Sequence, residues 1–163
     1  MPSAIQLIPL WIQVVLALAP AVGTFAAAVG LALNVLQSRK TNLITRAGLV
    51  AACLKTFAED EDIQNAFYAL EYGTFTYSEN FHNTPEEREI DKLLRHFSNL
   101  ALAWQAKLLT TEDIAPVRYY VLRVVRNEEI AKYLDFMERW VKDAKIGEHP
   151  YAVLSALCNS LEK

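Results

Sequence analysis

Charged side chains are absent from the first 38 residues of the chain, because every lysine, arginine, aspartate and glutamate lies at or beyond Arg39. The surface of a water-soluble domain carries such side chains throughout, so their absence excludes an ordinary soluble surface for this stretch. The remaining residues have the charge content of a typical globular domain. The sequence therefore predicts two parts, an uncharged segment at residues 1–38 and a charged domain at residues 39–163.

Residues that carry known chemistry are also few. The two cysteines, Cys53 and Cys158, lack the close spacing of a zinc knuckle or a redox Cys-x-x-C motif, so free thiols are expected, with one long-range disulfide as the alternative. His82, His96 and His149 have no neighbouring ligand at metal-binding spacing, and the glycines form no phosphate loop. We predict no metal, no cofactor and no catalytic residue. Whether the chain is an enzyme stays open, with a non-enzyme favoured.

A positive charge excess is lacking as well. The formal net charge is -3 and the pI is about 5.6, which gives no general attraction for nucleic acid. One basic and aromatic stretch stands at residues 118–126, but no further cluster of lysine or arginine extends it. Paired carboxylates lie mostly in expected first helical turns, where the helix dipole accounts for them. No nucleic-acid partner is therefore predicted.

The uncharged segment is long enough to cross a lipid bilayer. From Ala4 to Leu36 its strongly polar side chains are Gln6, Gln13 and Asn34, and a membrane helix needs about 20 mainly apolar residues. A cleaved signal peptide would begin with basic residues and have a shorter apolar run, neither of which is present. We therefore predict an uncleaved transmembrane helix at residues 1–38, in preference to a signal peptide or a buried core helix.

The basic residues near this segment predict its orientation. Arg39, Lys40 and Arg46 follow the predicted span, and no basic side chain precedes it. Because positive flanks stay on the cytoplasmic side, we expect a single-pass protein of the inner (plasma) membrane with a cytoplasmic C-terminal domain.

Small residues recur on one side of the predicted membrane helix. Helical spacing brings together Ala19, Gly23, Ala27, Gly30 and Asn34. Small side chains let another helix backbone approach closely, and an amide in hydrocarbon seeks a partner there. This side is a hypothetical interface with another transmembrane helix, from an identical copy or from another subunit of a membrane complex. The alternative is that membrane helices are simply rich in glycine and alanine.

The charged domain is predicted to be a bundle of about five helices with short connections. No run of alternating apolar and polar residues competes as a strand, so the predicted fold class is all-α. Thr84, Pro85 and Glu87 form a capping box that opens the best specified helix, which should be central to the bundle. Apolar residues at helical spacing predict helices at about 42–58, 59–72, 85–108, 112–126 and 128–145, with a short last one from residue 150.

The connection between the second and third predicted helices is rich in aromatic residues. Phe75, Tyr77 and Phe81 lie in a segment too irregular to be a strand. Such rings line a groove for a partner or ligand, or they fold back and seal the base of a small core. The second arrangement is the commoner one.

A polar cluster is predicted beside the central helix. Asp91 adjoins the apolar side of that helix, while Arg123, Asn127 and Tyr133 stand near the junction of the fourth and fifth predicted helices. We expect a partly buried ion pair of Asp91 with Arg123, a helix cap at Asn127 and a hydrogen bond from Tyr133 nearby. Such a cluster would orient helices and would not catalyse a reaction.

Three segments of the domain, residues 89–97, 123–127 and 133–136, carry a resemblance to known proteins. The sequence resembles a bacterial family of short proteins of unknown function, in which one membrane helix precedes a helical domain. The resemblance covers the chain from the anchor to about Trp140. It implies the same architecture, and it implies no activity and no catalytic residue.

These observations favour a membrane-anchored, non-catalytic interaction or scaffolding module, an accessory subunit of a membrane assembly whose partners are the lipid bilayer and another transmembrane helix. One alternative is a membrane-bound sensor or effector in phage defence or a stress response. The other is an enzyme with an unrecognised site in a pocket beside the aromatic connection.

Overall fold

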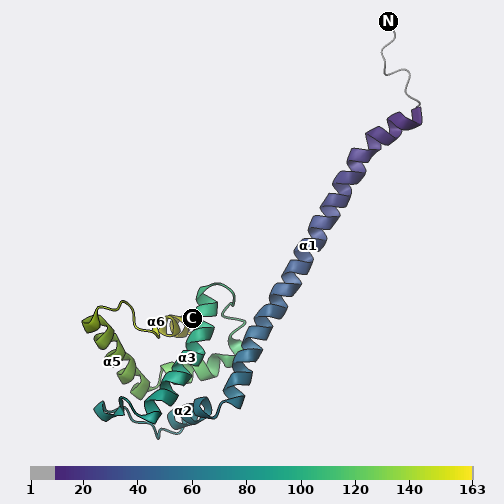
Figure 1. Ribbon diagram of the computed structural model, residues 1–163. Coiled ribbons are helices and arrows are strands. Elements are labelled where there is room, and N and C mark those ends of the chain that lie inside the picture. The colour runs from purple at the N-terminus through teal and green to yellow at the C-terminus, as the bar shows by residue number, and fades with distance from the viewer. Residues whose placement is uncertain (1–9, 163) are drawn as a thin grey trace. The chain divides into compact units, whose positions relative to one another are not determined.

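The computed structural model describes the backbone of residues 10–162, with side chains from residue 31 onward except at 32, 33, 38, 39 and 79. Every regular element within residues 10–162 is a helix, so the all-α prediction is confirmed (Figure 1). The α-helices are α1 (Leu10–Glu59), α2 (Glu61–Glu71), α3 (Pro85–Gln105), α4 (Arg118–Val125), α5 (Glu128–Ala144) and α6 (Ala152–Leu161), and the short 3-10 helices are η2 (Glu79–Phe81) and η3 (Ala115–Val117).

The chain divides into two compact units, residues 1–44 and 45–163. The predicted boundary at residues 38 and 39 lies six residues before the observed one. The helical domain described below is the second unit, which includes the last part of α1.

The predicted membrane anchor falls mostly on residues whose side chains lie outside those that the structure describes. This holds for Ala19, Gly23, Ala27 and Gly30, whereas Asn34 is described and exposed. Among the described residues, no helix is both long enough and apolar enough to span a membrane. Three described side chains at the end of the uncharged segment are apolar and more than half exposed, namely Leu31, Val35 and Leu36.

Helix boundaries in the domain follow the local sequence. The Asp60 and Thr84 side chains cap α2 and α3 by accepting the backbone N–H groups of residues 63 and 87, and Pro85 occupies the first turn of α3 as predicted. The Asn127 side chain caps α5 in the same way. Pro116 lies within η3, so the fourth predicted helix is divided into η3 and α4.

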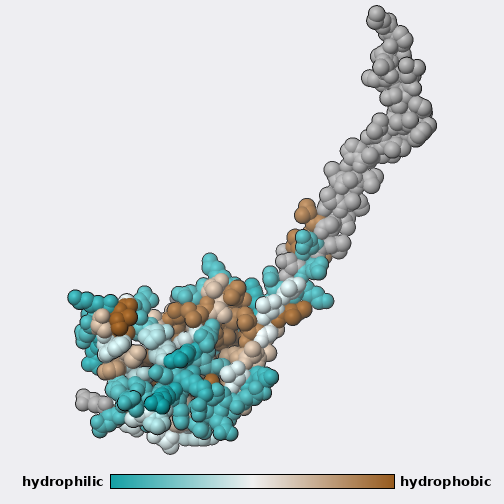
Figure 2. Space-filling view, viewed as in Figure 1, coloured by the Kyte–Doolittle hydropathy of each residue, from teal (hydrophilic) through white to brown (hydrophobic). Residues whose placement is uncertain are grey.

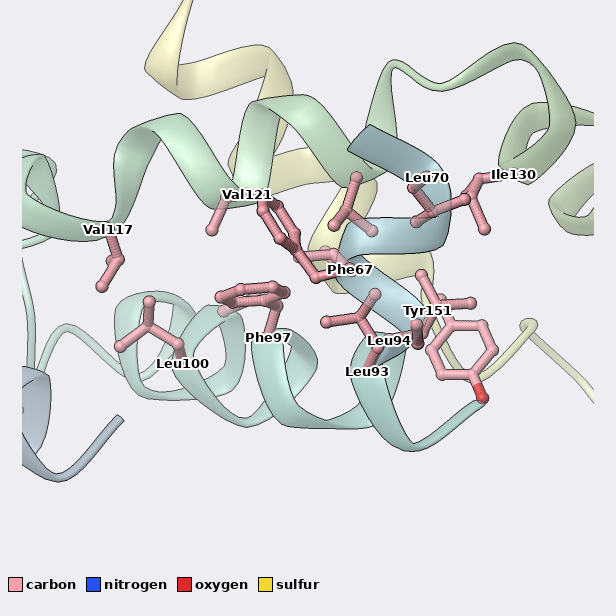
Figure 3. Close-up of a cluster of buried hydrophobic side chains, with 14 of the residues drawn as sticks. Phe67, Leu70, Leu93, Leu94, Phe97, Leu100, Val117, Val121, Ile130 and Tyr151 are labelled. Carbon is pink, nitrogen blue, oxygen red and sulfur yellow. The ribbon is translucent and has the colours of Figure 1, made fainter. Parts of the chain in front are cut away.

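Helix α3 is the central element of the domain, as its wide apolar face predicts. It packs against α2 and α6, and α4 packs against α2, α5 and α6. Leu93, Leu94 and Phe97 of α3 are fully buried, and they meet Phe67 of α2 and Val121 of α4 in one cluster (Figure 3). Burial of apolar side chains such as these is the dominant favourable contribution to folding.

The last turns of α1 belong to the same core. Val50 is buried, and the Phe57 ring lies 5.3 Å from the ring of Phe67 and 4.8 Å from that of Tyr120.

The Lys92 ammonium contacts both carboxylates at the start of α2, at 2.8 Å from Asp60 and 2.6 Å from Asp62. These pairs are partly exposed, so packing contributes more than charge to holding α2 against α3.

Replacing Leu94 by alanine should destabilise the domain by about 2–5 kcal/mol, because the change removes buried methyl groups and leaves a cavity. Urea unfolding of the purified chain, followed by far-UV circular dichroism, measures the loss. Leu102→Ala is the control, because Leu102 lies on the same helix but is half exposed. Equal losses in the two variants would contradict the central position of α3.

Candidate binding site beside the aromatic loop

The aromatic loop, residues 74–84, connects α2 to α3 and carries the three rings identified in the sequence. Phe75 and Phe81 are each 3% exposed and pack edge to face, with ring centroids 5.3 Å apart. Phe81 also packs against Tyr133 of α5 at 5.3 Å. Tyr77 is half-buried and faces a cleft. Two rings therefore seal the core, and the third lines a concave surface.

Two carboxylates hold the backbone of this loop. Glu129, in the first turn of α5, accepts the backbone N–H of Tyr77 at 2.9 Å, and Glu87, in the first turn of α3, accepts that of Asn83 at 2.5 Å. A hydrogen bond from Lys132 lowers the pKa of Glu129, and the bond from the Tyr77 backbone lowers it further. Ionised carboxylates make stronger hydrogen bonds than neutral groups, so the loop is fixed at both ends.

A chain of hydrogen bonds joins Tyr77, His82 and Glu87. His82 Nδ1 lies 2.8 Å from Glu87 Oε1, and the Tyr77 hydroxyl lies 3.1 Å from His82 Nε2. Partial burial would raise the pKa of Glu87, but hydrogen bonds from His82 and the Asn83 backbone lower it. Because an ionised carboxylate only accepts hydrogen bonds, His82 Nδ1 donates to Glu87, and the opposite ring nitrogen, Nε2, is hydrogen-bonded to the Tyr77 hydroxyl. The chain fixes both rings in orientation.

The Asp91 carboxylate binds two buried tyrosines. The hydroxyls of Tyr133 in α5 and Tyr151, just before α6, each donate a hydrogen bond of 2.8 Å to Asp91 Oδ1. Burial, strengthened by the adjacent carboxylate, raises the pKa of both phenols well above their usual range. One oxygen of α3 thus connects three helical segments.

The predicted ion pair of Asp91 with Arg123 is wrong. Arg123 instead binds Glu71 at the end of α2, with its Nε 2.7 Å from the carboxylate and its Nη2 3.0 Å from the backbone oxygen. The Tyr119 hydroxyl donates to the same carboxylate at 2.6 Å. The side of α4 that carries Arg123 is turned to α2, so the guanidinium lies away from Asp91.

The other two members of the predicted cluster lie close to their expected positions. The Asn127 side chain caps α5, and its Nδ2 lies 3.4 Å from the backbone oxygen of Leu70. Tyr133 makes the polar contact nearby, and its partner is the Asp91 carboxylate. The cluster orients helices, as expected, through phenol hydrogen bonds in place of the ion pair.

A cleft of about 540 Å³ opens between the aromatic loop and α5. Tyr77 and His82 of the loop form one wall, and the other wall is a row of α5 side chains, Phe136, Arg139, Trp140 and Asp143. The His82 and Phe136 rings pack at a tilt of 31° with centroids 4.1 Å apart, and Trp140 is 51% exposed. Rings and charged groups together make this cleft the strongest candidate for recognition of a small molecule.

A second, more apolar groove of about 270 Å³ lies between the last part of α1 and α3. Its walls include Leu49, Ala103 and the pair Cys53 and His96, whose Sγ and Nε2 are 3.3 Å apart. Burial raises the pKa of Cys53 to about 11 and lowers that of His96. The pair is therefore a neutral thiol beside a neutral imidazole. A neutral thiol is a poor nucleophile, because the reactive form of cysteine is the thiolate. Both cysteines are free, as expected.

Within the part of the chain that the structure describes, no three histidine, cysteine, aspartate or glutamate side chains are arranged to hold a metal ion. Comparisons with models of known protein families, with curated proteins and with solved structures found no match. The resemblance seen in residues 89–97, 123–127 and 133–136 therefore stays a prediction.

Some residues of the site carried a signal that sequence analysis did not use. The α5 wall follows helical i, i+3, i+4, i+7 spacing, from Phe136 to Asp143, within the helix predicted at about 128–145. A half-exposed tryptophan in such a row points to a surface with a role in binding. Tyr151 had no comparable signal, because its contact with Asp91 depends on the path of the chain between α5 and α6.

The two buried phenols predict a loss of stability at high pH. The pKa values of the two phenols are raised in the folded state, so as the pH rises the tyrosines of the unfolded chain ionise before those of the folded chain. Stability is therefore retained below about pH 10 and lost above it. Above that pH, each tyrosine should lower the free energy of unfolding by up to about 1.4 kcal/mol per pH unit. Urea unfolding between neutral pH and pH 11 measures the slope.

The double variant Tyr133→Phe with Tyr151→Phe should show a shallower slope above about pH 10 than the wild type. Tyr72→Phe is the matched control, because Tyr72 is 74% exposed. If the double variant kept the wild-type slope, the two phenols would not be the groups that link stability to pH.

Proposed function

We propose that the chain is a membrane-anchored, non-catalytic interaction module, an accessory subunit of an inner-membrane assembly whose helical domain lies in the cytoplasm. The observation that carries the proposal is the absence of any charged side chain before Arg39, next to a domain that buries its own apolar core. A stretch of that length and composition is stable in lipid and costly to expose to water.

The end of the uncharged segment supports the anchor. Leu31, Val35 and Leu36 are exposed at 68%, 51% and 61%, so these side chains are available to lipid or to another apolar surface. The small-residue side formed by Ala19, Gly23, Ala27, Gly30 and Asn34 belongs to the proposal as the contact with a second transmembrane helix.

The apolar groove between α1 and α3 supports a protein partner for the domain. The visible face of the domain is mostly hydrophilic and carries apolar patches (Figure 2). Leu49 lines the groove and is 38% exposed, and Leu102 and Leu108 near the end of α3 are 50% and 57% exposed. An apolar groove with exposed leucine side chains favours a partner that inserts apolar side chains, such as one face of an amphipathic helix.

The neutral Cys53 and His96 pair supports a non-catalytic role for this groove. A thiol whose pKa is raised to about 11 is protonated at neutral pH, and the neighbouring imidazole is neutral because burial lowers its pKa. Neither group is prepared for covalent catalysis.

The anchor is tested by membrane fractionation. The wild-type chain should remain in the membrane pellet after alkaline extraction, and protease added to the cytoplasmic side should digest the helical domain. The double variant Val22→Asp with Ala26→Asp should move to the soluble or aggregated fraction, because each aspartate costs about 3 kcal/mol near the centre of a membrane helix. The matched control, Thr41→Asp with Thr45→Asp, should stay in the pellet. Extraction of the wild type by alkali would contradict the proposal.

The interaction role is tested by native mass spectrometry of complexes extracted from the protein's own membranes in mild detergent. The wild type should be recovered with a second subunit, and Leu49→Glu should reduce that recovery about tenfold, because a carboxylate is costly to bury in an apolar interface. Asn65→Glu adds the same charge at an exposed position of α2 and should have no effect. A wild-type chain recovered only as a monomer would count against the proposal.

A further inference from the structure

The cleft beside the aromatic loop has its two walls fixed before any ligand arrives. The loop wall is held by Glu87 and Glu129, and the Tyr77 and His82 rings are oriented by their hydrogen bonds. The α5 wall belongs to a helix fastened to α3 through Tyr133. A preformed cleft loses little conformational entropy on binding, which favours affinity for a small ligand.

The cleft contains two opposite charges that do not pair with each other. Arg139 and Asp143 stand one helical turn apart, and within the described residues neither belongs to an ion pair. Arg139 Nε is 3.3 Å from the backbone oxygen of Asp135, which leaves the ends of the guanidinium for another partner. Arg139 precedes Asp143 by four residues, and an ion pair on a helix is weaker when the cation comes first in the sequence.

Asp143 also lies near the C-terminal end of α5, where the helix dipole favours a positive side chain. It stands in the last turn of α5, close to the negative end of the helix dipole. A carboxylate there does not stabilise the helix, so its favourable contacts lie outside the helix. The nearest space outside is the cleft that it lines.

We propose that this cleft binds a free α-amino acid with an aromatic side chain. The Arg139 guanidinium binds the α-carboxylate, and the Asp143 carboxylate binds the α-ammonium. Side chains four residues apart on a helix have Cβ atoms about 5–6 Å apart, which suits two charged groups carried on one carbon atom. Because both charges are met by opposite ones, the pair selects a zwitterion over a simple cation or anion.

The aromatic side chain of the ligand packs among the rings of the cleft. Phe136 packs against the tilted His82 ring, and Trp140 leaves half of its surface open for contact. Offset stacking and edge-to-face contacts add about 0.5–1.5 kcal/mol for each ring pair beyond the area buried. A volume of about 540 Å³ accommodates one such molecule with its ring against Phe136 and Trp140 and its charged end at Arg139 and Asp143. The inference is independent of the membrane anchor and goes beyond the proposed interaction role.

Isothermal titration calorimetry of the full chain in detergent micelles tests the proposal with L-phenylalanine, L-tyrosine and L-tryptophan. At least one of them should bind. Phenethylamine, which lacks the carboxylate, and 3-phenylpropanoate, which lacks the ammonium, should each bind about tenfold more weakly or worse, because each loses a hydrogen bond to a charged group. N-acetyl-phenylalanine amide, which mimics an aromatic residue within a peptide, should also bind more weakly.

Variants of α5 assign the two charges. Arg139→Gln and Asp143→Asn should each weaken binding of the preferred amino acid about tenfold. Arg139→Gln should leave the weak binding of phenethylamine unchanged, and Asp143→Asn should leave that of 3-phenylpropanoate unchanged. The matched controls are Lys142→Gln and Glu138→Gln, which remove charges from exposed positions of the same helix outside this cleft and should have no effect.

Three results would overturn the proposal. The first is no heat of binding with any of the three amino acids. The second is equal binding of phenethylamine or of the peptide mimic, which would indicate a cation site or a peptide site. The third is unchanged binding by both charge variants, which would place the ligand elsewhere on the chain.

Discussion

Burial of the apolar face of α3 is the constraint on which the domain depends. Leu93, Leu94 and Phe97 are buried on a helix that is covered by α2 and α6, so each neighbouring helix is positioned by the side chains that it places on α3. Asp91 stands at the edge of this face and accepts two phenol hydrogen bonds at one oxygen. Apolar packing brings the helices together. The Asp91 carboxylate then fixes the position of Tyr133 in α5 and of Tyr151 just before α6.

The candidate binding site is a consequence of the same arrangement. Helix α5 lies at the edge of the domain in Figure 1 and is linked to α3 through Tyr133 and to the aromatic loop through Glu129. Long aromatic side chains fill part of the space between α5 and the rest of the domain, and the unfilled part is the cleft. Phe75 and Phe81 are buried in the core, whereas Tyr77 and His82 of the same loop line the cleft. A helix held through aromatic side chains, and not by close backbone packing, gives a small domain room for a ligand.

Local features of the domain were predictable because they depend on residues close in sequence. The caps at Thr84 and Asn127 bind backbone groups two or three residues away, and Pro116, which has no backbone N–H, divides the fourth predicted helix into η3 and α4. The pairing of Asp91 with Arg123 was wrong because it requires the rotation of α4 relative to α3. Periodicity shows which face of each helix is apolar, but it does not show which polar residue at the edge of one face meets which residue on another helix. The structure pairs Arg123 with Glu71, and no sequence pattern distinguishes Glu71 from the other glutamates.

The sequence by itself determined that the domain is helical, that Thr84 and Asn127 cap the starts of α3 and α5, and that all charge lies at or beyond Arg39. These properties are sums of local preferences, and they are the same in any packing of the helices. Only the tertiary structure decided that one aspartate joins two tyrosines from distant segments, that two phenylalanines of the loop are buried while Tyr77 is not, and that Arg139 and Asp143 face a cleft lined with rings. Those outcomes depend on distances between elements, and such distances follow from how all the side chains fill the core together.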